Sequence, residues 1–101
     1  MPRPLFFSAI YVEPILTGKK RQTIRLTTTL CPGDEVAAMR RGVPAFARLR
    51  ITSVRRVGLY ELDDRCAGRD GMRTAAELRA VLKAIYPGAR RFSEIRFRLI
   101  R

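Results

Sequence analysis

The spacing of apolar and polar residues changes several times along the chain, and each change predicts a new element. Apolar residues fill positions 5–10, which predicts a short buried strand, and positions 11–16 fit a short helix. Gly18 follows as a natural helix stop. Further strands are predicted over 21–26, 35–39 and 45–57, with turns at 31–34 and 40–42 between them.

The clearest local signal is a helix that begins after Thr74. Thr74 and Glu77 have the spacing of a capping box, in which each side chain accepts a hydrogen bond from a backbone N–H near the other. One apolar stripe follows at helical spacing, which we interpret as core and not as a site: Leu78, Val81, Leu82 and Ile85. Pro87 and Gly88 end the helix.

The remaining segments complete a mixed pattern. One helical turn is predicted over 59–62, a polar loop over 63–73 and a final alternating strand over 94–99. The predicted order is strand, short helix, several strands, one longer helix, strand. This order predicts an α+β, mainly β fold: a small, partly open β-barrel with helices packed at its ends, as a single domain over 1–101.

The charge of the chain favours anionic partners. Twenty-one Lys and Arg stand against nine Asp and Glu, a net charge of +12. Such a field attracts phosphate backbones, although frequent arginine can also reflect base composition, and basic side chains on a sheet face are usually only solvated. Candidates for weak RNA contact are Lys19, Arg21, Arg40, Arg41, Arg55 and Arg56.

The residue types that are missing narrow the chemistry. The chain contains no histidine and no glycine-rich phosphate loop, and Cys31 and Cys66 lack metal-ligand spacing. We therefore expect no metal and no cofactor, and an enzyme of this sequence would work with Lys, Thr or Ser, and Asp or Glu. Without a run of 18 apolar residues we expect no membrane span, and the two cysteines fit reduced thiols of a cytoplasmic protein.

One segment resembles a known family. In Ile15 to Arg25, the spacing of Gly18, Lys20 and Arg25 resembles the ASCH signature. The commoner pattern has Glu where this chain has Thr23, and the Thr-Ile-Arg version is similar to the small bacterial branch that includes the N(4)-acetylcytidine amidohydrolases. The turn at 32–36 and the Tyr-Pro-Gly at 86–88 are also similar. The resemblance implies a PUA-like β-barrel whose relatives bind RNA or modified nucleosides.

The resemblance also implies a set of catalytic residues. That branch uses a Lys, a Thr three residues later and a Glu from a distant loop. The first two correspond to Lys20 and Thr23, and the third falls on Asp70, whose side chain is one methylene shorter than Glu. Arg25 is the candidate for binding a substrate oxygen, and Gly18 shapes the same substrate-binding loop.

Hydrolysis of an N-acyl amide is chemically consistent with these residues. Thr23 would attack the acyl carbon, and Lys20 would remove its proton once burial and nearby cations have lowered the lysine pKa. Spacing alone favours an exposed loop lysine and a strand threonine, because Lys-x-x-Thr is a weak pattern, and the catalytic interpretation depends on the resemblance. Three hypotheses therefore stay open: an amidohydrolase for N(4)-acetylcytidine or a related nucleoside, an RNA-binding module, and a metal-independent ribonuclease. The chain is expected as a monomer or weak dimer.

Overall fold

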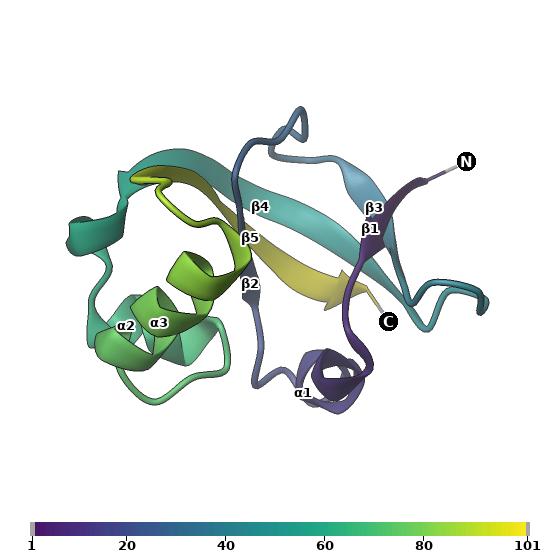
Figure 1. Ribbon diagram of the computed structural model, residues 1–101. Coiled ribbons are helices and arrows are strands. Elements are labelled where there is room, and N and C mark those ends of the chain that lie inside the picture. Colours follow the sequence, from purple (N-terminus) through teal and green to yellow (C-terminus); the bar gives the residue numbers. More distant parts are fainter. Residues whose placement is uncertain (1, 101) are drawn as a thin grey trace.

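The computed structural model describes residues 2–100, and a mixed five-stranded sheet forms its centre (Figure 1). In space the strands run in the order β1-β3-β4-β5-β2. Short 3-10 turns cover Ala9–Tyr11 and Leu59–Glu61. The strands are β1 (Arg3–Phe6), β2 (Gln22–Arg25), β3 (Glu35–Met39), β4 (Ala47–Gly58) and β5 (Arg91–Ile100), and the helices are α1 (Val12–Leu16), α2 (Asp64–Arg69) and α3 (Ala75–Ile85).

The long β4–β5 pair is the backbone of the sheet. Its antiparallel register runs from Arg48 opposite Ile100 to Gly58 opposite Arg91, with a shift between Ile51 and Ser53. β1 pairs with β3 in parallel, and the other pairs are antiparallel. Among the described strands β1 and β2 are the two edges, so the sheet is not closed. The predicted α+β, mainly β architecture of a partly open barrel is confirmed.

Two hydrophobic clusters pack against this sheet. One lies among β1, β3, β4 and β5 and includes the fully buried Val36 and Leu49. The other joins β2, α2 and α3, and includes Leu78 and the fully buried Phe92. Figure 1 shows α2 and α3 together on one side, α1 apart from them, and β2 between the two groups. The chain from α1 into β2 therefore runs between the two helical groups.

Most of the predicted strands and turns are present, and two predictions were wrong. The first strand covers Arg3–Phe6, whereas residues 9–16 are helical, because the apolar run at 5–10 does not reveal its period. The predicted loop over 63–73 contains α2. Asp63 caps this helix by accepting a hydrogen bond from the backbone N–H of Cys66 (2.8 Å). Cys66 and Ala67 form the buried face of the helix.

The start of α3 follows the prediction in part. Thr74 Oγ1 accepts a hydrogen bond from the backbone N–H of Glu77 (3.2 Å). The Glu77 carboxylate, however, accepts a hydrogen bond from the backbone N–H of Arg73 (3.3 Å) and not from that of Thr74. The capping box is thus displaced by one residue on its acidic side. No helix in residues 2–100 is long and apolar enough to cross a membrane.

Candidate active site

A cavity of about 180 Å³ opens between β2, α3 and the segment that leads into α1. Its walls come from residues 6–8 and Tyr11, from Lys20 and residues 23–25, from Asp70 and Met72, and from one face of α3 with Tyr86. Four segments that are distant in sequence thus place polar groups on one concave surface. Such convergence is typical of a ligand or active site.

Lys20 and Asp70 form a buried ion pair in this cavity. The Lys20 Nζ lies 3.2 Å from Asp70 Oδ1 and donates a hydrogen bond to the Asp70 backbone carbonyl oxygen (3.1 Å). Only 3% of Lys20 and 5% of Asp70 are exposed. Asp70 ends α2, and Gly71 follows with φ +90°, a left-handed conformation that favours glycine. The end of α2 therefore brings the carboxylate to the lysine.

Burial changes the proton affinity of both partners. Removal from water lowers the pKa of Lys20, although the Asp70 charge opposes this shift and Arg25 adds only a small effect in the same direction. Burial likewise raises the pKa of Asp70 against the attraction of Lys20. The lysine pKa thus falls chiefly by burial, not by crowding with Lys19 and Arg21, whose side chains are exposed. A lysine in this setting is suited to act as a base.

Thr23 and Arg25 lie on the same side of β2, because strand residues two apart face the same way. The Arg25 Nε donates a hydrogen bond to Thr23 Oγ1 (3.0 Å), and Arg25 Nη2 donates to the Phe6 carbonyl oxygen (2.7 Å). The guanidinium also lies 5.2 Å from the ring centre of Phe7. The buried threonine hydroxyl therefore accepts from a fixed cation, which favours its deprotonated form.

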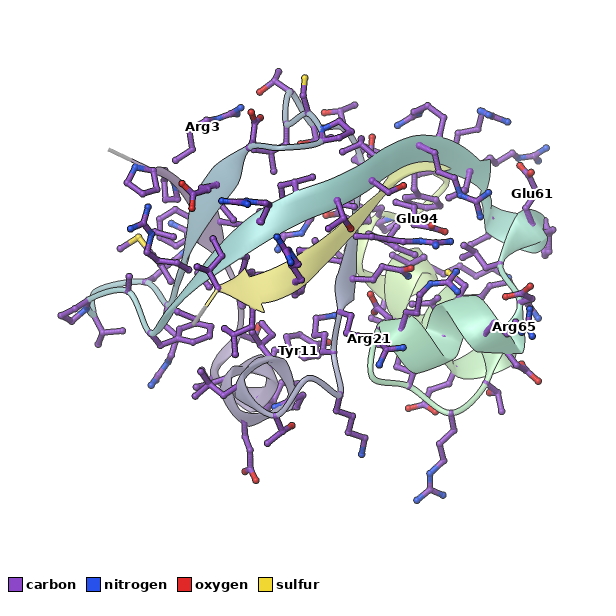
Figure 2. The ribbon with its side chains drawn as sticks, turned by 180° about the vertical axis from the view of Figure 1, so that it is seen from behind. Arg3, Tyr11, Arg21, Glu61, Arg65 and Glu94 are labelled. Atoms are coloured by element: carbon purple, nitrogen blue, oxygen red, sulfur yellow. The ribbon has the colours of Figure 1, made fainter. Side chains whose placement is uncertain are left out.

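Tyr11 adds an aromatic wall beside the ion pair. The Lys20 Nζ lies 4.5 Å from the centre of its ring. Burial, and then the charge of Asp70, raise the pKa of the Tyr11 phenol, so it stays protonated at neutral pH. Figure 2 shows Tyr11 beside α1, on the side that faces Arg21 and α2. The ammonium is thus enclosed by a carboxylate on one side and a ring face on the other.

The opposite face of β2 carries a second polar network that sequence reasoning missed. The Gln22 amide Nε2 donates to the backbone oxygen of Cys66 (3.2 Å), and Arg69 Nε donates to Gln22 Oε1 (3.1 Å). The Cys66 Sγ lies 3.5 Å from an oxygen of Glu94, which is almost fully buried in the half of β5 nearest α2 (Figure 2). This network anchors α2, and hence Asp70, to β2.

Glu94 keeps its charge despite burial. Burial raises its pKa, but hydrogen bonds from Arg55 (3.2 Å) and Arg96 (3.0 Å) outweigh that effect and lower the pKa below its ordinary value. A glutamate in an alternating strand predicts only an outward-facing side chain. The two arginines opposite and near it were the signal that a buried acid needed partners.

The sequence predicted the apolar stripe of α3 as core alone, but the stripe also lines the cavity. Leu78 and Leu82 are buried, but Val81 is half-buried and Ile85 is 59% exposed, and all four side chains line the cavity. The helix lies across the edge of the sheet, so one stripe both closes the core and forms a wall. Helical spacing shows which residues share a face, but not where the partner surface ends.

The other predicted site residues are dispersed. Gly18 ends α1 with φ +79° and lies outside the cavity lining. Arg40 and Arg41 line a second, adjoining cavity. On β4, Arg55 pairs with Glu94, and Arg56 donates hydrogen bonds to the Leu26 carbonyl oxygen (2.7 Å) and to Ser93 (3.1 Å). Cys31 and Cys66 are both free thiols.

The polar groups of the cavity suit acid–base chemistry by side chains. Within residues 2–100 no group of three or more Cys, Asp or Glu side chains has the arrangement of a metal site. The cavity instead collects one buried lysine, one carboxylate, one hydroxyl and one guanidinium. Groups of these four types are able to serve acyl transfer as base, orienting acid, nucleophile and oxyanion donor.

Comparison with known proteins identifies the relatives of this chain. No family model matches it. It is 32% identical to the N(4)-acetylcytidine amidohydrolase of Vibrio vulnificus (strain YJ016) over 103 residues, which cover 98% of the chain and 97% of that relative. The ASCH domain from Lactobacillus crispatus JV V101 has the same fold, with a TM-score of 0.84 at 14% identity over 96% of this chain and 78% of that one. The ASCH protein from Zymomonas mobilis is similar too, with a TM-score of 0.76 at 12% identity over 97% and 69%. The chain therefore belongs to the ASCH family, in the branch of the N(4)-acetylcytidine amidohydrolases.

Proposed function

We propose that this protein is an amidohydrolase that removes the acetyl group from N(4)-acetylcytidine or a closely related N-acylated cytosine nucleoside. The observation that carries the proposal is the buried Lys20–Asp70 pair, which shares one cavity with Thr23 and Arg25. The name of the Vibrio vulnificus relative indicates the same substrate. Burial of a charged lysine costs free energy. A site that uses a neutral amine as its base would explain why a buried lysine is present here.

In the proposed first step, neutral Lys20 takes the proton of the Thr23 hydroxyl while Thr23 Oγ1 attacks the acyl carbon. The carbonyl oxygen becomes an oxyanion, which the N–H groups of Arg25 that do not bind Thr23 or Phe6 would stabilise. The C–N bond then breaks, and the Lys20 ammonium returns the proton to the leaving N4 amine of cytosine. The product of this step is an acyl ester on Thr23.

In the second step, water replaces the amine. Lys20, neutral again, removes a proton from a water molecule that attacks the ester carbon, and the proton passes to Thr23 Oγ1 as the C–O bond breaks. Acetic acid, which loses its proton to water and becomes acetate, and the free enzyme remain. Arg25 faces the oxyanion in both steps, since both intermediates form at the same carbon.

Asp70 fits the role of an orienting group. Its Oδ1 lies buried 3.2 Å from Lys20 Nζ, a charged contact that holds the amine in place. A carboxylate oxygen can accept more than one hydrogen bond, so an N–H of the leaving amine could also bind there. Asp70 would then orient both the lysine and the substrate.

The direct test is turnover of N(4)-acetylcytidine by the purified protein, with cytidine and acetate measured separately. We expect stoichiometric release of both products. Thr23→Ala removes the nucleophile and Lys20→Met removes the base, so each should lower kcat/KM by about 10³-fold or more. The double variant should be scarcely slower than either single one, because members of a catalytic unit do not act additively.

Matched controls separate chemistry from folding. Thr52→Ala removes an exposed hydroxyl from β4, and Lys83→Met removes an exposed charge from α3. Both should retain wild-type turnover, and all variants should unfold cooperatively on heating. Full turnover by Thr23→Ala would exclude the acyl ester and leave direct attack by water. A wild-type protein that leaves N(4)-acetylcytidine and its nucleotides intact would overturn the proposed function.

A further inference from the structure

A second cavity adjoins the candidate active site. It has a volume of about 470 Å³ and shares Phe6, Phe7, Ser8 and Arg25 with the first cavity. Its remaining wall includes Arg40 and Arg41, from the turn between β3 and β4. The two cavities are therefore neighbouring parts of one depression, and the second part is strongly basic.

The charges of Arg40 and Arg41 are uncompensated. Both side chains are exposed, and no ion pair within residues 2–100 involves either of them. By contrast, Arg48 and Arg50 on the following strand share Glu35. The Arg41 guanidinium lies 5.4 Å from the centre of the Phe6 ring, a contact that holds it at the boundary of the two cavities. A pair of free guanidinium groups beside a hydroxyl is a typical anion site.

The size of the first cavity indicates what lies beside it. Ligand pockets usually measure about 300–1,000 Å³, so a cavity of about 180 Å³ would not enclose a whole nucleoside. With the acylated base against Lys20 and Thr23, the ribose would extend past Phe6 and Ser8, which line both cavities, into the second cavity. The Ser8 side chain is exposed and makes no capping hydrogen bond to the 3-10 turn that follows it, so its hydroxyl is available to a ligand.

From this arrangement we infer that the second cavity is an anion subsite that binds a phosphate on the ribose of the substrate. The preferred substrate is then an N-acylated cytidine nucleotide, either free or within an RNA strand, and not the neutral nucleoside. The identity of the base rests on the proposed function. The anion subsite rests on Arg40, Arg41 and Ser8.

Binding of the reaction product tests the subsite without any turnover. We would measure cytidine, cytidine 5′-monophosphate and cytidine 3′-monophosphate by titration calorimetry at low salt. At least one monophosphate should bind the wild type about tenfold or more tightly than cytidine, and added salt should reduce that difference. Arg40→Gln/Arg41→Gln should abolish the difference while leaving the affinity for cytidine unchanged.

The control variant is Arg65→Gln/Arg90→Gln, which lowers the net charge by the same amount. Both residues are exposed and line neither cavity, and Figure 2 shows Arg65 on the outer side of α2. It should keep the wild-type preference for the monophosphate. Equal binding of cytidine and both monophosphates by the wild type would overturn the inference. So would a preference that survives in Arg40→Gln/Arg41→Gln or disappears in the control.

Kinetics then separate this inference from the proposed function and identify the source of the phosphate. A protein that prefers the monophosphate through Arg40 and Arg41 but deacetylates nothing would keep the subsite and overturn the proposed function. Deacetylation of the nucleoside and the monophosphates with equal KM would support the proposed function and overturn the anion subsite. A lower KM for a short RNA that contains one N(4)-acetylcytidine than for the monophosphate assigns RNA as the source. A higher KM for that RNA assigns the free nucleotide.

Discussion

At the scale of single residues, two opposing effects set the pKa of the Lys20 amine. Burial favours the neutral amine, whereas Asp70, 3.2 Å away, favours the ammonium. The carboxylate therefore limits how much free base exists at neutral pH, and it also holds the amine in place. This balance predicts how the rate depends on pH, because in the proposed mechanism only the neutral amine accepts the Thr23 proton.

We expect kcat/KM to rise with pH, with a midpoint below the pH at which an exposed lysine loses its proton. In Asp70→Asn the attraction for the ammonium is gone, so the lysine pKa falls further and the midpoint should move to lower pH. The maximal rate should fall as well, because the amine is less well oriented. The measurement is a pH–rate profile of both proteins.

Glu61→Gln provides the control for the lost charge, since Glu61 is exposed and is not part of the cavity lining. Its profile should coincide with that of the wild type. A midpoint that moves upward in Asp70→Asn would contradict Lys20 as the base. Complete loss of activity at every pH, with folding intact, would instead identify Asp70 as the base.

At the scale of elements, α3 has two separate tasks along one stripe. Leu82 is 3% exposed and packs in the cluster beneath α2 and α3, whereas Ile85, one turn later, is mostly exposed at the cavity. Stability and substrate binding should therefore respond to different positions of the same helix.

We expect Leu82→Ala to lower the free energy of unfolding by about 2–5 kcal/mol. Ile85→Ser should scarcely change stability but should raise KM about three- to tenfold, because it removes apolar surface from the cavity wall. Ala84→Ser, on the adjacent exposed position, is the control and should change neither. Thermal unfolding and steady-state kinetics measure the two effects. An unchanged KM in Ile85→Ser would show that the substrate does not reach the end of α3.

The elements also show what the sequence can and cannot predict. β3 and α3 follow from local spacing and a local cap, so their positions were predicted closely. α2 has six residues, too few to display a helical period, and the Asp63 cap together with the contacts of α2 with β2 explains it. Lys20 and Thr23 come from one continuous motif. Their meeting with Asp70, fifty residues after Lys20, depends on that missed helix, and the resemblance to a family was needed to suggest it.

The buried side of β5 illustrates the same limit. An alternating strand predicts that Ile95 and Phe97 point inward, which they do, and that Glu94 points outward, which it does not. Both faces of this half of β5 are covered, one by the sheet core and one by α2. Alternation reports a single buried face, so it fails where a second layer is added.

At the scale of the whole molecule, the net charge of +12 should govern encounters with polyanions. We expect affinity for a short single-stranded RNA to fall steeply between about 50 and 200 mM salt, because each neutralised phosphate releases counterions. Arg40→Gln/Arg41→Gln should reduce the slope of log K against log salt by about 1–2. Fluorescence anisotropy with a labelled RNA measures this slope.

Arg55→Gln should reduce the slope of log K against log salt less than Arg40→Gln or Arg41→Gln does. The reason is that Arg55 forms an ion pair with Glu94, which offsets its charge. An affinity that is flat across this salt range would remove RNA as a partner. No binding even at low salt would leave a free nucleoside or nucleotide as the ligand.

The position of β2 at the edge of the sheet has one more consequence. β2 has four residues, and just before it the Arg21 carbonyl accepts a hydrogen bond from the Phe97 N–H while the Arg21 N–H donates to the Arg69 carbonyl oxygen (2.7 Å). The end of α2 is thus hydrogen-bonded to the residue just before this edge strand. If α2 and α3 detached by local opening, the Lys20–Asp70 pair would separate, and an unpaired strand edge would be exposed to other molecules. Inactivation and self-association would then be one event, and any ligand that bridges β2 and α3 would protect the protein against both.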